Sequence, residues 1–136
     1  MQPGRNILLV DDDPDMRETF ADFLSDEGYF VETACDGVSA LRALKTFPAD
    51  LLLTDLNMPD MDGIELIRRA RAVAGGVPAV LLTASPGDNP RGVMNAAGAA
   101  AFMIKPVAPE NLLSVVHRIL GAPRIHFASA PAAPAR

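Results

Sequence analysis

The sequence is poor in cysteine, contains no long apolar run and has no excess of basic residues. Cys35 is the only cysteine, so an internal disulfide is excluded and a reducing compartment is indicated. No apolar run approaches the roughly 20 residues that a membrane-spanning helix needs, and the first residues do not resemble a signal peptide. We therefore expect a cytoplasmic protein that does not interact with membranes.

The acidic balance of the chain argues against direct binding to nucleic acid. The formal net charge is -5 at pH 7, and all 17 Asp and Glu residues lie at or before Glu110. Binding to nucleic acid requires a basic surface that neutralises phosphates, and the acidic body of this chain does not offer one.

Strand-like apolar runs alternate five times with segments of helical periodicity, and the chain contains no internal repeat. The predicted strands cover residues 6–10, 29–34, 51–54, 78–83 and 100–104, and the predicted helices cover residues 14–27, 37–47, 63–75, 90–97 and 109–120. The second helix carries the apolar residues Val38, Leu41 and Leu44. The fourth helix has the least favourable sequence, because Pro and Gly are frequent there. Residues 1–120 are predicted to form one domain, and the Ala- and Pro-rich residues 121–136 a tail or linker.

Five strand-then-helix units indicate an α/β fold, in which a parallel sheet carries helices on both faces. Crossovers in such sheets are right-handed, so the carboxyl ends of all strands point to one edge. This rule brings together residues that are distant in the sequence. The groups expected at that edge are Asp11 and Asp12 after the first strand, Asp55 after the third, Thr83 at the fourth and Lys105 after the fifth.

Three carboxylates at one edge repel each other unless a cation lies among them. Ligands that offer only oxygen, without His or Cys, favour a hard ion such as Mg²⁺. Asp13 is assigned to capping the first helix, which leaves Asp11 and Asp12 as ligand candidates. A metal, an ammonium and a hydroxyl around a carboxylate are the parts needed for phosphoryl transfer, with Asp55 as the nucleophile.

The segments Val10-Asp11-Asp12, Asp55-Leu56-Asn57-Met58-Pro59-Asp60-Met61-Asp62-Gly63, Thr83-Ala84 and Lys105-Pro106 together resemble the receiver domain of two-component response regulators. The resemblance extends over about residues 5–120. It implies a doubly wound five-stranded parallel sheet with strand order 2-1-3-4-5. It also implies a role in phosphorelay signalling, without enzymatic turnover apart from Mg²⁺-dependent self-phosphorylation and slow loss of the phosphoryl group.

The resemblance assigns a role to each residue that matches the family pattern. Asp55 is implied as the phosphoacceptor, supplied by a histidine kinase or histidine phosphotransferase. Mg²⁺ is implied to bind Asp12, Asp55 and the backbone carbonyl of Asn57 directly, and Asp11 mainly through water.

The remaining matched residues are implied to read the phosphoryl group. Lys105 is expected to pair with it, Thr83 to move toward it, and Phe102 to swing inward with Thr83. The output is expected to be a protein contact or a homodimer through the fourth helix, fifth strand and fifth helix. In the last helix, Leu113 and Leu120 extend an apolar band beyond the residues that suffice to cover the sheet.

Three alternatives remain open from the sequence. A Mg²⁺-dependent aspartyl phosphatase would need a second Asp two residues after Asp55 as general acid, where this chain has Asn57. A flavodoxin-like nucleotide binder would need a Gly- or Ser/Thr-rich phosphate loop after the first strand, where this chain has three aspartates. The chain is otherwise a single-domain regulator or the receiver part of a larger regulator or hybrid kinase.

Overall fold

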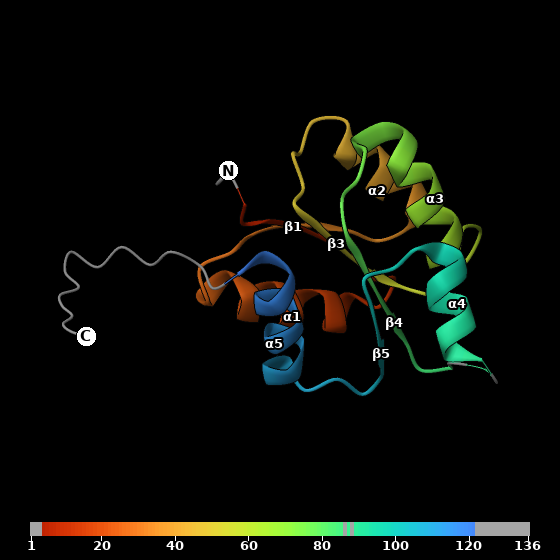
Figure 1. The fold of residues 1–136 in the computed structure, drawn as a ribbon. Coiled ribbons are helices and arrows are strands. Elements are labelled where there is room, and N and C mark those ends of the chain that lie inside the picture. The colour runs from red at the N-terminus through yellow and green to blue at the C-terminus, as the bar shows by residue number, and fades with distance from the viewer. Residues whose placement is uncertain (1–3, 86, 88, 122–136) are drawn as a thin grey trace, which may run out of the picture.

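The computed structural model describes residues 4–85, 87 and 89–121, in which five strands alternate with five helices (Figure 1). The strands are β1 (Asn6–Val10), β2 (Phe30–Ala34), β3 (Leu51–Asp55), β4 (Ala79–Thr83) and β5 (Ala101–Ile104). The helices are α1 (Pro14–Asp26), α2 (Gly37–Leu44), α3 (Gly63–Ala74), α4 (Pro90–Ala97) and α5 (Pro109–Leu120). Every predicted element is present, and α2 ends earlier than predicted. The predicted tail lies outside the described residues except for Gly121.

The strands form one parallel sheet with the order β2-β1-β3-β4-β5, which confirms the expected order. The first strand therefore pairs with both β2 and β3, and the chain turns back toward β4 and β5 on the other side of β3. This change of direction places the end of β1 beside the end of β3. In doubly wound sheets, ligands bind at such a point, outside the carboxyl ends of the strands.

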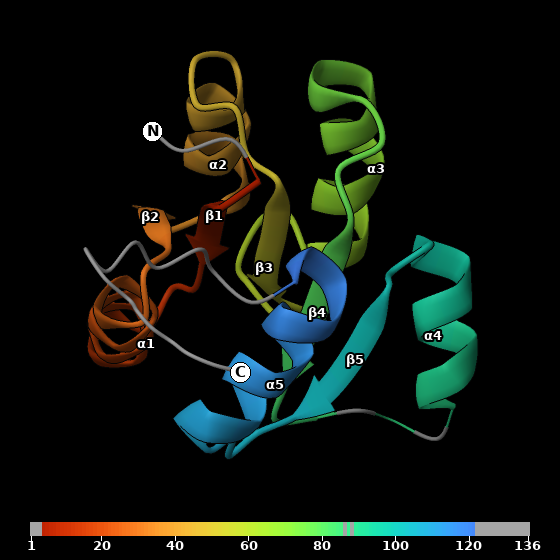
Figure 2. The same ribbon diagram turned by 60° about the vertical axis from the view of Figure 1, so that its left-hand side comes forward.

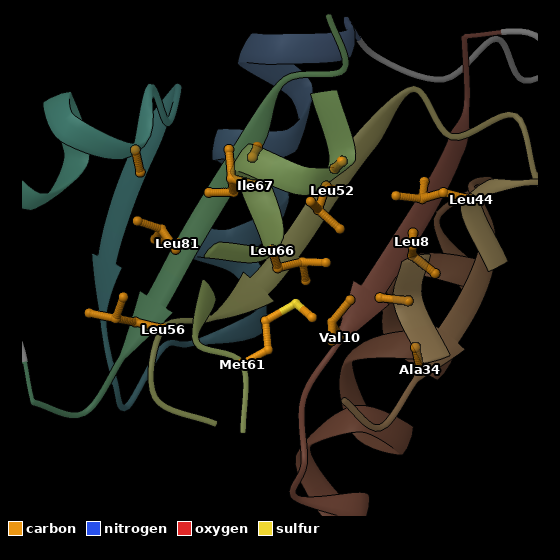
Figure 3. Close-up of a cluster of buried hydrophobic side chains, with 14 of the residues drawn as sticks. Leu8, Val10, Ala34, Leu44, Leu52, Leu56, Met61, Leu66, Ile67 and Leu81 are labelled. Carbon is orange, nitrogen blue, oxygen red and sulfur yellow. The ribbon is translucent and has the colours of Figure 1, made fainter. Parts of the chain in front are cut away.

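The central strands are buried on both faces, which explains their nearly continuous apolar sequences. Successive side chains alternate between two cores: Leu8 and Leu52 contribute to one, whereas Ile7 and Leu53 contribute to the other. Helices α2, α3 and α4 cover the first core, part of which Figure 3 shows. Helices α1 and α5 cover the second, on the opposite face of the sheet (Figure 2).

The inner face of α2 includes only some of its apolar residues. Gly37, Ala40 and Leu44 are buried, and Leu41 is half-buried, but Val38 is 53% exposed. Val38 therefore does not contribute to the core. At 100° per residue, Val38 lies about 200° away from Ala40 around the helix axis, so burial of Ala40 turns Val38 to solvent.

Helix α4 forms despite its unfavourable sequence because both of its ends are capped. At the N-terminus the Asn89 side chain accepts a hydrogen bond from the backbone N–H of Gly92 (3.0 Å), and Pro90 occupies the first turn. At the C-terminus Gly98 adopts a left-handed conformation with φ 72°. The Arg71 guanidinium of α3 donates to the carbonyl of Ala97 (2.9 Å), so α4 is also held from a neighbouring helix.

The helices of the described ranges are too short or too polar to cross a membrane.

Candidate functional site

The carboxyl edge of the sheet brings the predicted residues together. Asp11 directly follows β1, Asp55 is the last residue of β3, Thr83 is the last residue of β4, and Lys105 directly follows β5. Asp11, Asp55 and Thr83 are buried, and their positions are set by strands that are themselves packed on both faces. The polar groups at the carboxyl ends of β1, β3, β4 and β5 are therefore held rigidly and face one another.

Three carboxylates form the centre of the site. One carboxylate oxygen each of Asp11, Asp12 and Asp55 lies within 4.8 Å of the others. Asp11 and Asp55 are buried, whereas Asp12 is exposed, so the cluster opens to solvent on the side of Asp12. The same three residues line a hollow at the sheet edge together with Lys105.

Lys105 holds two of these carboxylates. Its Nζ donates to Asp11 Oδ2 at 3.0 Å and lies 3.4 Å from Asp55 Oδ2. Burial favours the neutral form of this ammonium, but the Asp11 and Asp55 carboxylates outweigh burial and raise the pKa of Lys105 above its ordinary value. Lys105 therefore remains charged beside the ends of β1 and β3. It lies 94 residues after Asp11 in the sequence.

The Asp55 carboxylate is buried, and its charge is only partly compensated by Lys105. Burial raises its pKa, and the Lys105 ammonium only partly offsets that effect because it lies closer to Asp11. The nearby charge of Asp11 raises the pKa further, while a hydrogen bond from the backbone N–H of Asn57 lowers it. A buried carboxylate in need of a further positive charge is suited to bind a cation.

Asp11 is fixed by contacts that the sequence prediction did not include. Its Oδ1 accepts from the backbone N–H of Asp13 (2.9 Å), and its carbonyl accepts from Arg17 (2.7 Å). Arg17 is the one basic residue of α1. Its position in an otherwise acidic helix is the feature of the sequence that could have indicated this contact. Asp13 accepts from the backbone N–H of Asp15 (3.0 Å), which confirms its assignment as the helix cap.

The Thr83 hydroxyl joins two loops in this structure. It donates to Asn57 Oδ1 at 2.6 Å and accepts from the backbone N–H of Ser85 at 3.0 Å. Phe102 pairs in register with Leu81, two residues before Thr83, so its side chain lies on the same face of the sheet as that of Thr83. Phe102 is half-buried and packs against the core beneath α4.

Gly63 allows α3 to begin close to the backbone of Asp55 and Leu56. A Cβ on Gly63 would come within 2.5 Å of the Asp55 carbonyl oxygen and 3.0 Å of the Leu56 Cα, both backbone atoms that cannot move aside. Gly63 also donates its N–H to the carbonyl of Leu56 (2.8 Å). A side chain at this position would push α3 away from the strand that carries Asp55.

The donor set fits a magnesium ion. All three side chains offer oxygen, which a hard divalent ion prefers, and the open side next to Asp12 leaves room for water. Three carboxylates and one ammonium sum to a formal charge of -2, which a divalent cation neutralises. Asp11, Asp12 and Asp55 are the side chains that would hold it.

Alanine substitutions of the two neighbouring aspartates are expected to have opposite effects on metal-free stability. Asp12→Ala should raise the free energy of unfolding in EDTA by at most about 1 kcal/mol, because it removes repulsion at an exposed position. Asp11→Ala should lower it by roughly 1–3 kcal/mol, because it removes the charged hydrogen bond to Lys105. Urea denaturation of both variants measures this difference. Both should bind Mg²⁺ more weakly, and destabilisation by Asp12→Ala would show that Asp12 has a structural role.

The comparisons with known proteins agree with this geometry. Residues 7–117 match the family described as the response regulator receiver domain. The response regulator MprA of Mycobacterium ulcerans is 40% identical over 114 residues, which cover 84% of this chain and 49% of that protein. The chain therefore spans about half the length of this relative.

Solved structures of similar fold include a chemotaxis protein and the receiver domain of a sensor histidine kinase. The chemotaxis protein CheY4 of Vibrio cholerae matches with a TM-score of 0.79 and 34% identity, covering 85% of this chain and 98% of that one. The receiver domain of the sensor histidine kinase PA1611 from Pseudomonas aeruginosa, which holds a magnesium ion in its active-site cleft, matches with a TM-score of 0.77 and 31% identity, covering 87% and 98% of the two chains. From the family match, this similarity and the shared fold, we conclude that this chain belongs to the response regulator receiver domain family.

Proposed function

We propose that this chain accepts a phosphoryl group on Asp55 from a phosphohistidine of a histidine kinase or phosphotransferase, in a Mg²⁺-dependent reaction. The observation that carries the proposal is the cluster of three carboxylates within 4.8 Å, bridged by Lys105 between Asp11 and Asp55. The family to which the chain belongs, and the magnesium ion in the cleft of the similar PA1611 domain, support it.

The chemistry follows from the side chains that surround Asp55. A carboxylate oxygen of Asp55 attacks phosphorus, the P–N bond to the imidazole breaks, and an acyl phosphate forms as the imidazole leaves. A bound Mg²⁺ would supply positive charge to the phosphoryl oxygens. Lys105 already lies 3.4 Å from the Asp55 carboxylate, so its ammonium is placed to pair with a phosphoryl oxygen there. The hollow beside Asp12 gives the phosphodonor access.

Incubation of the purified protein with acetyl phosphate tests this function directly. The intact mass should increase by one phosphoryl group when Mg²⁺ is present, and no increase should occur in excess EDTA, because Lys105 neutralises only one of the three carboxylate charges of the site. The same samples should not hydrolyse small phosphate esters, since Asn57 stands where an aspartyl phosphatase needs its general acid. An unmodified mass in Mg²⁺, or turnover of such esters, would contradict the proposal.

We further propose that the partner surface lies over α4 and β5. A groove there is lined by Pro90, Arg91, Met94, Phe102 and Ile104, and Ile104 is 53% exposed. The fifth helix contributes less than the sequence suggested. Leu113 and Leu120 are half-buried and pack against the core shared by α1 and α5, which leaves only part of their apolar surface available to a partner. A downstream protein or a second copy of the chain would then dock mainly through the α4–β5 groove.

Ile104→Glu is expected to prevent phosphorylation-dependent assembly. Sedimentation with beryllofluoride and Mg²⁺, a stable mimic of the phosphoryl group, should show association of the wild type and at least a tenfold weaker association of the variant. Val73→Glu is the matched control, because Val73 is also exposed (41%) but lies on α3. If the wild type stays monomeric, the same pair of variants is compared in binding to the physiological target. Equal behaviour of both variants in both assays would exclude this surface.

A further inference from the structure

The Thr83 hydroxyl is fully engaged before any phosphoryl group arrives. Thr83 is completely buried, its hydroxyl donates to Asn57 Oδ1 at 2.6 Å, and it accepts from the Ser85 N–H at 3.0 Å. A hydroxyl carries a single proton, so it can donate to only one acceptor at a time. To donate to a phosphoryl oxygen on Asp55, Thr83 must first give up its bond to Asn57.

Asn57 touches both partners of this exchange. Its backbone N–H bonds to the Asp55 carboxylate, and its side-chain oxygen holds Thr83, which lies 26 residues further along the chain. The residue itself is exposed, so water can take over the side-chain oxygen when Thr83 leaves. The structure thus shows a short hydrogen bond from Thr83 to the side-chain oxygen of a residue that is exposed to water.

Ser85 connects the exchange of the Thr83 hydrogen bond to the segment that leads to α4. Its N–H donates to the Thr83 hydroxyl at the point where the chain leaves β4 for the segment that leads to α4. A rotation of Thr83 that brings its hydroxyl toward Asp55 changes the acceptor position for Ser85 as well. One hydroxyl thus connects the turn after β3, the end of β4 and the start of the connection to α4.

We propose that the Asn57 side chain is a positioning residue that restrains the switch: it holds Thr83 in the unphosphorylated arrangement and sets how readily the site responds to a phosphoryl group. This inference rests on the proposed function of Asp55 as phosphoacceptor. It assigns to the Asn57 side chain a role separate from that of its backbone carbonyl, which the family resemblance implies as a metal ligand.

A double-mutant cycle with Asn57→Ala and Thr83→Val tests the proposal, with the dissociation constant for beryllofluoride in saturating Mg²⁺ as the readout. Asn57→Ala removes the acceptor that competes for the Thr83 proton, so binding should become about two- to tenfold tighter, as expected for the loss of one neutral hydrogen bond. In the Thr83→Val background there is no hydroxyl to release, and Asn57→Ala should leave the dissociation constant unchanged. The comparison of the two backgrounds identifies the part of the effect of Asn57→Ala that depends on the Thr83 hydroxyl.

The Ser85 amide resonance in NMR spectra gives a second readout that a merely structural role would not affect. On titration with beryllofluoride it should shift in the wild type, and reach the bound position at lower concentration in Asn57→Ala. The proposed restraint would be overturned if Asn57→Ala bound beryllofluoride equally or more weakly, or if its affinity rose equally in both backgrounds. Either result would leave the role of Asp55 intact. A wild type that binds no beryllofluoride would instead overturn the proposed function and this inference together.

Discussion

Asp55→Asn is expected to abolish phosphoryl labelling of this protein by acetyl phosphate or a phosphohistidine donor. The amide keeps the size of the side chain but lacks the anionic oxygen that attacks phosphorus. Asp11, the other buried carboxylate beside Lys105, already accepts hydrogen bonds from Lys105 and from the backbone N–H of Asp13. Intact-mass spectrometry and labelling with radioactive donor measure the effect. We expect at least a hundredfold decrease in initial rate, down to the background of the assay.

Asp60→Asn is the matched control for this substitution. Asp60 lies in the turn that follows Asp55 and is exposed, and the same Asp-to-Asn change there should leave labelling intact. Its backbone is left-handed, with φ 72°, a conformation that Asn tolerates as well as Asp, so the turn should be preserved. Labelling of the Asp55 variant at the wild-type rate would show that the phosphoryl group is carried elsewhere.

Lys105→Met should have the second-largest effect, because it removes the ammonium that pairs with two carboxylates. The labelling rate should fall by roughly two to three orders of magnitude, as is typical for the loss of one preorganised group that stabilises transition-state charge. Lys45→Met is the control, since Lys45 is exposed at the end of α2 and contacts none of the site residues. A Lys105 variant that labels normally would remove this residue from the mechanism.

The same substitution also predicts a change in the pH dependence of stability without metal. Lys105 lowers the pKa of Asp55, so in its absence burial and the charge of Asp11 raise that pKa further. A carboxyl group whose pKa is raised by folding stabilises the folded state below its unfolded pKa, and this stabilisation is lost as the pH rises through the folded pKa. From the ordinary value of 3.8 upward, Lys105→Met should therefore lose more stability toward neutral pH than the wild type. Denaturation in EDTA at a series of pH values measures the difference.

The sequence by itself was sufficient to predict the order of elements and the position of the site. The strands at 6–10 and 51–54 are apolar on both faces and end in aspartate, a pattern that is typical of buried parallel strands. Because all strands of such a sheet point the same way, the groups that follow them must meet at one edge. The clustering of Asp11, Asp12 and Asp55 next to Lys105 depends in addition on the strand order, which places β1 beside β3 and which the family resemblance implied.

Only the tertiary structure decided which side chains touch and which faces are buried. Helical periodicity alone did not show that Val38 of α2 is exposed or that Leu113 of α5 packs partly against the core. The Arg17 contact to Asp11 and the hydrogen bond between Thr83 and Asn57 are also absent from any sequence pattern. Local periodicity reports the spacing of apolar residues along one element, whereas these contacts depend on the rotation and distance between elements, which the whole core determines.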